Sequence, residues 1–414
     1  MYWHVLNWIA GSILGLAWFS RIVDAALGMR NIVDIARPEW DRVPATGVAS
    51  RNARSTPYQP RVSIIVPARN EEEHIRETLT RLLTLEYSNY EVIAVDDRST
   101  DRTGAIMDEV ARLTGSSDHR AVGSLEARST QLRVIHVSEL PPGWLGKTHA
   151  MWTAAQQATG DWLLFTDADV LFKPDALRRA IAYAETEKAD HVVLFPRMIM
   201  ETPGERMMIA FFQALFVFGH RPWKVADPEA SDHMGVGAFN MVRRSVYDAV
   251  GTYQALRMEV LDDMKLGKVV KNAGFAQRNV FGEDLISLRW AKGALGVVNN
   301  LTKNFFAVLS FQVWRTVASV VGLAFLNLGP FLGLWLAHGW ARVPYAIALA
   351  SILGIYRGMA SKSAVPWHYF FLHPLSTSLF VYTLLRSMVH TFQNDGIVWR
   401  GTRYPLEELR KGLV

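Results

Sequence analysis

The sequence predicts an α/β domain built on a mostly parallel sheet and flanked by transmembrane helices. Between residues 61 and 295, short apolar runs alternate with segments of helical periodicity, and several of these runs end in acidic residues. Such alternation is typical of parallel sheets whose strands are joined by right-handed helical crossovers. Two runs outside this region, 3–20 and 317–340, contain no Lys, Arg, Asp or Glu, and about 20 apolar residues suffice to span a bilayer as a helix.

The composition fits a soluble domain joined to apolar segments. Of the 414 residues, 50% are hydrophobic and 20% are charged. Cysteine is absent, which excludes disulfides, thiolate metal sites and a cysteine nucleophile. Lys and Arg exceed Asp and Glu by only five, and no basic stripe is interleaved with aromatic residues. We therefore expect basic residues beside an anionic lipid bilayer and no nucleic-acid partner.

Residues 1–22 are predicted to form an N-terminal transmembrane anchor. No Lys or Arg precedes the apolar run, whereas Arg21 and three further arginines follow it. The positive-inside rule therefore places the next segment in the cytoplasm. A cleaved signal peptide is the weaker alternative, because its positive charge precedes the apolar run. Residues 23–60, which contain several prolines, are expected to form a linker.

The α/β domain is predicted over 61–295 and opens with two strands that end in polar residues. The first strand is expected over 62–66, where Pro67 stops it. Asn70 is the expected N-cap of the helix that follows. The second strand ends in a pair of acids, of which Asp97 is the second.

The most distinctive motif ends a later strand. A helix that opens at Lys147 leads into the apolar run 162–165, which reads as a buried strand and is followed by Asp167-Ala168-Asp169. Two carboxylates this close repel each other unless a positive charge lies between them, and a divalent cation holding a phosphate meets that need. Solvated acids at a strand end are the alternative.

The C-terminal part is predicted to be membrane-associated. Residues 296–312 form an expected interfacial amphipathic helix, with an ordinary surface helix as the alternative. A transmembrane region is expected over 313–390 and a basic tail over 391–414. The candidate spans are 317–340, 365–385 and a shorter apolar segment, 343–356. A cytoplasmic tail requires an even number of spans after the domain, which three candidates do not provide.

Three motifs, in this order, resemble family 2 glycosyltransferases of the GT-A fold, a Rossmann-like architecture. They are Pro67-Ala68-Arg69-Asn70-Glu71, Asp96-Asp97 and Asp167-Ala168-Asp169. The chain is similar to the membrane-anchored members that act on lipids, such as ceramide glucosyltransferases and hopanoid-associated glycosyltransferases. The resemblance implies inverting transfer of one hexose from a UDP-sugar to a hydroxyl of a membrane lipid. It also implies an integral membrane protein, expected in the bacterial inner membrane, with a cytoplasmic catalytic domain.

The resemblance implies roles for the strand-end residues. Asp169 would ligate Mg²⁺ or Mn²⁺, and Asp167 would face both the metal and the donor ribose. Asp97 would meet the uracil, although capping of the next helix is an alternative role for this residue. The nucleotide pocket would be lined by Pro67, Ala68, Asn70 and Glu71.

Further polar residues complete the predicted site. Lys147 stands at a helix start, which is unfavourable for a cation, and the donor phosphates would remove that mismatch. Asp263 is the expected general base, with Asp262 supporting it, and an ordinary acidic first helical turn is the alternative. Arg289 and Trp290 are expected to meet the pyrophosphate and the acceptor.

The Arg-Trp pair resembles the end of the family's (Gln/Arg)-X-X-Arg-Trp signature, but Ile286 stands at its first position. This departure favours single-sugar transfer over processive polysaccharide synthesis. Transfer to polyprenyl phosphate, and a membrane scaffold with a degenerate nucleotide site, are further alternatives. A Rossmann dehydrogenase is disfavoured because no glycine-rich turn follows the first strand.

Overall fold

The computed structural model describes residues 2–41, 59–115, 132–282, 284–360, 363 and 365–414, and the chain divides into two compact units. What we call the sheet unit comprises Val33–Arg197, Val225–Leu288 and Gly412–Val414. The helical unit comprises Met1–Ile32, Met198–Lys224 and Arg289–Lys411. Most of the predicted catalytic domain therefore lies in the sheet unit.

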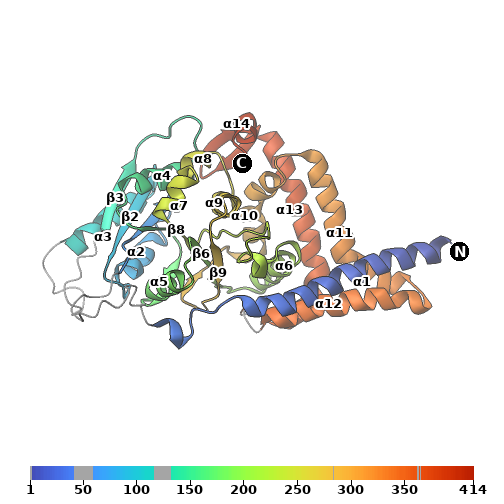
Figure 1. Cartoon of the computed structure of the whole chain (residues 1–414). Helices are drawn as coiled ribbons and strands as arrows, with labels where there is room; N and C mark the ends of the chain where they lie inside the picture. Colours follow the sequence, from blue (N-terminus) through green and yellow to red (C-terminus); the bar gives the residue numbers. More distant parts are fainter. Residues whose placement is uncertain (1, 42–58, 116–131, 283, 361–362, 364) are drawn as a thin grey trace. The chain divides into compact units, whose positions relative to one another are not determined.

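A seven-stranded sheet forms the centre of the sheet unit, in the order β3-β2-β1-β4-β8-β6-β9 (Figure 1). The neighbours from β3 to β4 are parallel, β8 is antiparallel to β4 and β6, and β6 is parallel to β9. The prediction of a mostly parallel α/β sheet is confirmed. The strands are β1 (Val62–Ala68), β2 (Tyr90–Asp97), β3 (Leu132–Val137), β4 (Trp162–Phe165), β6 (His191–Leu194), β8 (Asn240–Arg243) and β9 (Gln277–Val280).

Helices connect these strands and cover the sheet. They are α2 (Ile75–Leu83), α3 (Thr103–Gly115), α4 (Gly146–Gln157), α5 (Ala176–Thr186), α7 (Arg244–Ala249), α8 (Thr252–Ala255) and α9 (Asp262–Asn272). One buried core joins Ile65, Ile93 and Leu163 of the sheet to Ala154 of α4 and Leu266 of α9. Burial of this apolar surface, which contributes roughly 25 cal/mol per Å², holds α4 and α9 against the strands that carry the predicted site.

Short elements complete the sheet unit. The pair β5 (Leu171–Phe172) and β10 (Ile286–Leu288) is antiparallel. β7 (Arg197–Met198) lies where the chain passes from one unit to the other. A 3-10 turn, η2 (Pro38–Asp41), precedes the segment 42–58 of the predicted linker, which lies outside the described residues.

The expected stop at Pro67 is wrong, because β1 continues to Ala68. The carbonyl of Ile65 accepts a hydrogen bond from Thr166 on the β4 side. Along a strand, the backbone groups of every second residue point to the same neighbouring strand. The backbone of Pro67, two residues after Ile65, therefore also faces β4. The β4 ladder ends at the pair Ile65–Phe165, and the missing N–H of Pro67 therefore removes no ladder bond.

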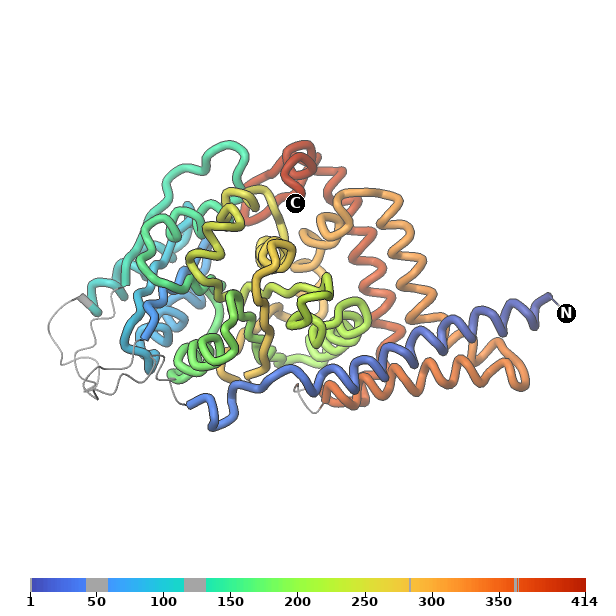
Figure 2. The backbone as a smooth tube through the Cα atoms, viewed as in Figure 1, coloured from blue at the N-terminus to red at the C-terminus, as the bar shows by residue number. Residues whose placement is uncertain are grey.

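The helical unit is built from long helices, and α1 and α12 run side by side (Figure 2). The α-helices are α1 (Tyr2–Gly28), α6 (Pro203–Gly219), α10 (Gly293–Val308), α11 (Val313–Leu336), α12 (Val343–Ala360), α13 (His373–Gln393) and α14 (Leu406–Lys411). The 3-10 turns are η1 (Met29–Asn31), η3 (Pro222–Lys224), η4 (Gly339–Arg342) and η5 (Trp367–Leu372). The predicted basic tail contains a hairpin of β11 (Gly396–Trp399) and β12 (Thr402–Pro405).

Two predicted segments differ in extent from the observed helices. α1 continues past residue 22 to Gly28, so the start of the predicted linker is helical. The predicted interfacial helix 296–312 corresponds largely to α10. α10 packs against α6 and α13 and buries Val297, Leu301 and Phe306. Its place at a membrane surface stays a prediction.

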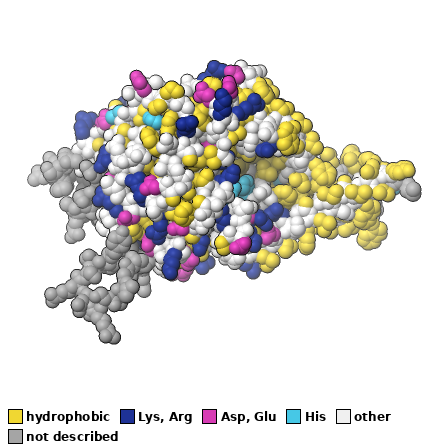
Figure 3. Space-filling model, turned by 45° about the horizontal axis from the view of Figure 1, so that its top comes forward, with side chains coloured by type: hydrophobic (Ala, Val, Ile, Leu, Met, Phe, Trp, Pro, Cys, Tyr) yellow, Lys and Arg dark blue, Asp and Glu magenta, His cyan; other side chains and the backbone are white. Residues whose placement is uncertain are grey.

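Among the described residues, three helices are long and apolar enough to cross a membrane, namely Tyr2–Asn31, Val313–Leu336 and Gly339–Ala360. The apolar segment 343–356 is thus part of a longer helix, whereas the expected candidate 365–385 is not among the three. It falls largely in α13, which buries polar side chains such as His373, Ser376 and Thr383. Hydrophobic side chains cover the visible surface of the long helices (Figure 3), and those exposed on α1 include Leu6, Ile13 and Leu16.

Close packing of α1 on α12 depends on Gly15. A Cβ atom at this position would lie 2.8 Å from the carbonyl oxygen of Pro344. Small residues permit such close approach of membrane helices. We expect Gly15→Leu to destabilise the protein by about 1–3 kcal/mol, the usual cost of overpacking, as a lower thermal midpoint in detergent. The control is Gly322→Ala in α11, where a Cβ meets nothing within 4 Å, and an equal loss there would contradict the packing argument.

Candidate active site

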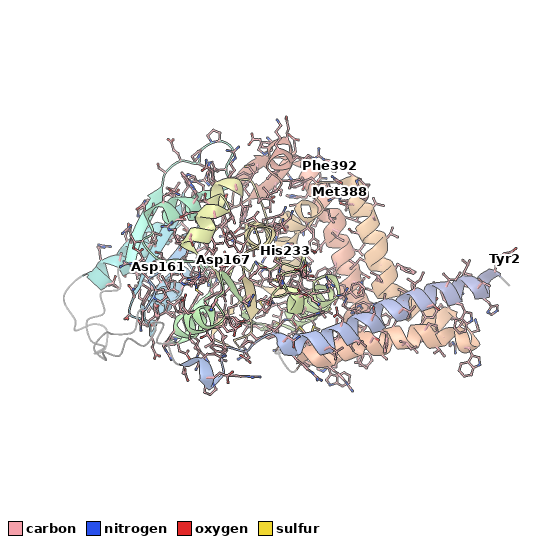
Figure 4. All side chains as sticks on the ribbon, in the orientation of Figure 1. Tyr2, Asp161, Asp167, His233, Met388 and Phe392 are labelled. Atoms are coloured by element: carbon pink, nitrogen blue, oxygen red, sulfur yellow. The ribbon has the colours of Figure 1, made fainter. Side chains whose placement is uncertain are left out.

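The candidate site lies at the carboxyl edge of the sheet, where β1 and β4 are neighbours. The strand order leads from β1 to β2 and β3 on one side and to β4 on the other, which makes this a topological switch point. Asp97 ends β2, and Asp167 follows β4 by two residues. Asp161 and Asp167, just outside the two ends of β4, are labelled in Figure 4. Ligands of open α/β sheets bind at this edge.

Lys147 is at the centre of a cluster of carboxylates. Its Nζ lies 2.8 Å from Asp167 Oδ1 and 3.3 Å from Asp262 Oδ2. The side chain of Lys147 is 20% exposed and that of Asp262 is 7% exposed, so the pair is largely shielded from water. The anionic partners that a lysine in the first turn of a helix needs are therefore, in this structure, carboxylates of the protein itself.

Burial and mutual charge shift the pKa values in this cluster. Burial alone would lower the pKa of Lys147, but Asp167, Asp262 and Asp263 outweigh it and raise that pKa. Burial raises the pKa of Asp262 to about 7, although Lys147 opposes the shift. Burial likewise raises the pKa of Asp263. A carboxylate with a raised pKa holds a proton more strongly, which suits a general base.

Asp263 is held by backbone donors at the start of α9. Its Oδ2 accepts a hydrogen bond from Gly237 N at 2.8 Å, and its Oδ1 accepts one from Met264 N at 2.7 Å. The acidic first turn is favourable for a helix in any case. The ion pair of Lys147 with the neighbouring Asp262 and the bond from Gly237 to Asp263 go beyond that simple role, because they join α9 to α4 and to the loop before β8.

The loop before β8 approaches both acids closely. Asp167 N donates to the carbonyl oxygen of Gly237 at 3.0 Å, and a Cβ on Gly237 would lie 2.5 Å from Asp167 Oδ2. At the start of this loop, His233, labelled in Figure 4, has its Nδ1 3.2 Å from the Ser231 carbonyl oxygen. The sequence marks 235–239 as a possible acceptor-side loop, but the close approach of Gly237 to Asp167 and Asp263 was not predicted, although two glycines one residue apart before a strand are a recognisable signal of it.

Replacing Gly235 should disturb the base directly. A Cβ there would lie 1.8 Å from the carbonyl oxygen of Asp263, and backbone cannot move as a flexible side chain can. We expect Gly235→Ala to lower transferase activity by about 100-fold, because a displacement near 1 Å has that effect on positioned catalytic groups. Gly219→Ala, where a Cβ meets nothing within 4 Å, is the control. Normal activity of Gly235→Ala would contradict the observed approach.

Asp97 is buried (4% exposed) and pairs with arginine. Arg98 Nε lies 2.8 Å from its Oδ1 and Arg98 Nη2 lies 3.2 Å from its Oδ2, while Arg69 Nη1 is 3.9 Å from Oδ2. Helix capping, the alternative role for Asp97, belongs instead to Asp101, whose Oδ1 accepts a bond from Thr103 N at 2.9 Å. The pairing of Arg98 with Asp97 was not predicted. The only indication of it in the sequence is that the two residues are adjacent.

The turn after β1 is tied to the loop after β2. Asn70 adopts φ 54°, and its Oδ1 accepts a hydrogen bond from Thr100 N at 2.8 Å. The expected N-cap role of Asn70 is therefore wrong, because α2 begins only at Ile75. Glu71 N donates to Thr103 Oγ1 at 2.7 Å. The turn that was predicted to line the nucleotide pocket thus lies beside Asp97, and Pro67 and Ala68 end the adjoining strand.

Asp167 and Asp169 both lie in the segment after β4, and both are half-buried. Among the described residues, no group of three or more His, Asp or Glu is arranged to hold a metal ion. Mg²⁺ is commonly bound by one or two carboxylates together with substrate phosphates and water. Two carboxylates at a ligand-binding edge fit such a shared site, in which the donor completes the coordination.

Arg289 and Trp290 belong to the helical unit. Arg289 Nη1 lies 2.6 Å from Glu201 Oε2, and Nη2 lies 2.8 Å from Oε1 of the fully buried Glu205. Burial opposes ionisation of Glu205, but Arg289 and backbone donors outweigh it and lower its pKa to about 2. Trp290 packs on Phe212, with ring centroids 5.0 Å apart. The structure thus shows Arg289 joining the starts of α6 and α10, and its predicted contact with pyrophosphate stays a prediction.

The chain is similar to known glycosyltransferases. Residues 63–263 match the family described as "Glycosyl transferase family 2". The chain is similar to the 4,4'-diaponeurosporenoate glycosyltransferase of Staphylococcus haemolyticus, with 23% identity over 246 residues that cover 59% of this chain and 60% of that protein. The protein of the same name from Staphylococcus aureus is 21% identical over 367 residues, which cover 84% of this chain and 89% of that protein.

A solved structure has the same fold. It is a mannosyltransferase from Pyrobaculum calidifontis in complex with GDP-Man and Mn2+, which matches with a TM-score of 0.52 and 20% identity. The match covers 93% of this chain and 99% of that chain. The expected GT-A architecture, with candidate membrane helices flanking the sheet unit, is confirmed.

Proposed function

Because the chain contains a glycosyltransferase family 2 domain of the GT-A fold, we propose that it transfers one hexose from a nucleotide sugar to a hydroxyl of a membrane lipid, with inversion. The observation that carries the proposal is the convergence of Lys147 with Asp167 and Asp262, next to Asp263, at the switch point of the sheet. One acid at this edge can help to bind the donor, while another can take the proton from the acceptor hydroxyl.

In the proposed reaction, the lipid hydroxyl attacks the anomeric carbon and the nucleoside diphosphate leaves. Asp263 takes the hydroxyl proton: burial raises its pKa, which suits it to this task, and two backbone donors hold the carboxylate in place. Lys147 balances the charge of the neighbouring acids before and after proton transfer. Asp169 and Asp167 would hold Mg²⁺ or Mn²⁺, which when bound neutralises charge on the leaving diphosphate.

For the donor, we propose a UDP-sugar, with a GDP-sugar as the alternative. The UDP assignment comes from the resemblance of Asp97 and the Pro67–Glu71 segment to the family motifs. The GDP alternative comes from the mannosyltransferase of the same fold, which was solved with GDP-Man. Both donors have an N–H that can donate to a base-reading carboxylate such as Asp97.

For the acceptor, we propose a lipid such as a sphingolipid or hopanoid. The named substrate of the staphylococcal relatives, 4,4'-diaponeurosporenoate, supports a lipid-like acceptor. Exposed apolar side chains on α1 and α11, such as Leu16 and Val321, support contact with a bilayer. An acceptor that stays in the bilayer would explain why a catalytic domain is joined to such helices.

We further propose that the catalytic domain and the C-terminal tail both face the cytoplasm, in a bacterial inner membrane. Among the residues that the structure describes, two candidate spans follow the domain, Val313–Leu336 and Gly339–Ala360. Two is an even number, which supports a tail on the same side as the domain. The arginines after α1 support a cytoplasmic assignment for that side.

The test is to incubate membranes that contain the protein with labelled UDP- and GDP-hexoses, with and without Mn²⁺, and to extract the lipids. We expect one labelled lipid from one donor class, and loss of that lipid with Asp169→Ala or with a chelator. Absence of labelled lipid under every condition would overturn the proposal. A scaffold with a degenerate site, the non-enzymatic alternative, would keep its function in Asp169→Ala.

A further inference from the structure

A chain of buried hydrogen bonds crosses the sheet and ends at the proposed base. His191 of β6 is fully buried (0% exposed), and its neighbours Asn240 of β8 and Gln277 of β9 are 1% exposed each. Gln277 Nε2 lies 2.7 Å from His191 Nδ1, and His191 Nε2 contacts Asn240 Oδ1. Asn240 Nδ2 lies 3.3 Å from the carbonyl oxygen of Asp263. This series of hydrogen bonds thus connects β9 with the first turn of α9.

Backbone groups at the β9 end determine the direction of every bond. Met234 N can only donate, so Gln277 Oε1 accepts its bond at 2.8 Å. The Gly267 carbonyl can only accept, so Gln277 Nε2 donates to it at 3.0 Å. The same nitrogen therefore donates to His191 Nδ1, which leaves the ring proton on Nε2. That proton is donated to Asn240 Oδ1, and the amide nitrogen of Asn240 is left as a donor towards α9.

The stability of the fold alone does not explain why these three buried side chains are polar. The residues that follow His191 in β6 and Asn240 in β8, Val192 and Met241, are apolar and fully buried. A buried polar group costs free energy unless it is paired, and a typical hydrogen bond contributes only about 1 kcal/mol net. Burial lowers the pKa of His191 to about 4, so the ring is neutral near pH 7, as the directed chain requires. Fully paired buried networks of this kind specify one arrangement of the groups around them.

Both ends of this series of hydrogen bonds bind backbone groups of segments that contact or contain Asp263. Gln277 holds the N–H of Met234, at the start of the loop whose Gly237 N donates to Asp263 Oδ2. Gln277 also holds a carbonyl oxygen inside α9, and Asn240 holds the carbonyl of Asp263 itself. The two elements that bind the Asp263 carboxylate are therefore fixed to the sheet through the same three side chains.

We propose that His191, with Asn240 and Gln277, forms a relay that positions Asp263 for proton abstraction. This inference rests on the proposed function. His191 touches neither substrate nor reacting atoms and is a positioning residue. Its role predicts a defect in the chemical step, with donor and acceptor binding left largely unchanged.

The first test compares His191→Leu with Val193→Ala, a control in the same strand with no polar group. We expect both variants to lower the thermal midpoint. Only His191→Leu should lower kcat, by about 10- to 100-fold, with each KM within about twofold of wild type. An equal fall of kcat in both variants, or wild-type kcat in His191→Leu, would overturn the proposal.

The second test uses the nearly isosteric Asn240→Asp. Its carboxylate can still accept the bond from His191 Nε2, but it cannot donate to the backbone carbonyl oxygen of Asp263. The added carboxylate should raise the pKa of Asp263, moving the acid limb of the kcat profile up by about one pH unit. Lys147, Asp262 and Asp167 act on Asp263 through their charges in both proteins, so the difference reports on residue 240. An unchanged profile would count against the relay.

A third measurement does not depend on transfer. Ring-nitrogen NMR of the wild-type protein should show His191 protonated at Nε2 and unprotonated at Nδ1 at pH 7. The opposite tautomer, or a protonated ring, would overturn the relay even in a protein that labels no lipid. If wild type labels lipid and the variants match it, the relay alone fails. If wild type labels nothing, the proposed function fails, and the tautomer still decides the relay.

Discussion

Replacement of Asp263 by Asn should reduce lipid glycosylation by about 10²- to 10⁴-fold, the usual contribution of a general base. Asn is nearly isosteric and can still accept the hydrogen bond from Gly237 N, so the loop should keep its place. It cannot take a proton from the acceptor hydroxyl. We expect kcat to fall, with the KM of the donor little changed, in assays of labelled lipid at several donor concentrations.

Asp262→Asn is the matched control, because Asp262 adjoins Asp263 and contacts Lys147. It should lose less activity than Asp263→Asn, since Asp262 is assigned a supporting role. Near-full activity of Asp263→Asn would exclude the base assignment. It would favour an acceptor whose oxygen is already ionised, such as polyprenyl phosphate, because such an oxygen needs no base.

Much of the sheet unit could be predicted because its strands are short apolar runs that end in polar residues. The predicted strand 62–66 lies within β1, and the run 162–165 is β4. Asp161, before β4, is exposed, and β2 ends in the polar Asp97, so a change from apolar to polar residues marks these strand ends in the sequence. Pro67 was misread because its tolerance in β1 depends on where the neighbouring strand ends, which is a tertiary property.

The helical unit was harder to predict, since polarity in these helices is balanced by partners elsewhere in the chain. In α13, His373 contacts Asn327 and Tyr356 at 3.1 Å each, and Ser387 Oγ accepts a bond from Phe306 N at 2.9 Å. Hydropathy cannot anticipate such pairs. The predicted span 365–385 has a different cause, because length and composition alone leave α13 out of the helices that could cross a membrane.

In the site, the residue types were predictable and their partners were not. Acids at strand ends and a lysine at the start of a predicted helix are visible in the sequence. That Lys147 contacts Asp167 and Asp262, from segments far apart in the chain, depends on how α4 and α9 pack on the sheet. His191 had no sequence signal, because a histidine inside an apolar strand reads as an ordinary core residue.

Replacement of Lys147 by Met should be the most disruptive change in the site. It removes the cation from Asp167, Asp262 and Asp263 while keeping an unbranched side chain of similar length. Removing one partner of a buried pair costs about 3–5 kcal/mol. We expect a loss near the lower end, about 3 kcal/mol, because the Asp167 side chain is 38% exposed. Transfer should fall by more than about 100-fold, since electrostatic groups of this kind commonly contribute that much.

The pH dependence of stability tests whether charge causes this loss. The folded-state pKa of Asp262 is raised to about 7 from 3.8, so its ionisation destabilises the fold as the pH rises through that range. Lys147 opposes the shift, and without it the pKa of Asp262 should rise further. The folded wild type ionises Asp262 above about pH 7, whereas the folded variant should do so only at higher pH. The stability gap between Lys147→Met and wild type should therefore widen as the pH rises through about 7, as measured by denaturant unfolding. A gap that is constant with pH would indicate lost packing instead.

The double variant Lys147→Met/Asp262→Asn separates stability from catalysis. With one acid neutralised, the remaining carboxylates repel each other less, and we expect much of the lost stability to return. Activity should stay low, because the restored fold still lacks the cation beside Asp167 and Asp263. A double-mutant cycle on unfolding free energies then gives the coupling between Lys147 and Asp262. Recovery of both stability and transfer would mean that Lys147 only balances charge in the folded protein and takes no part in the reaction.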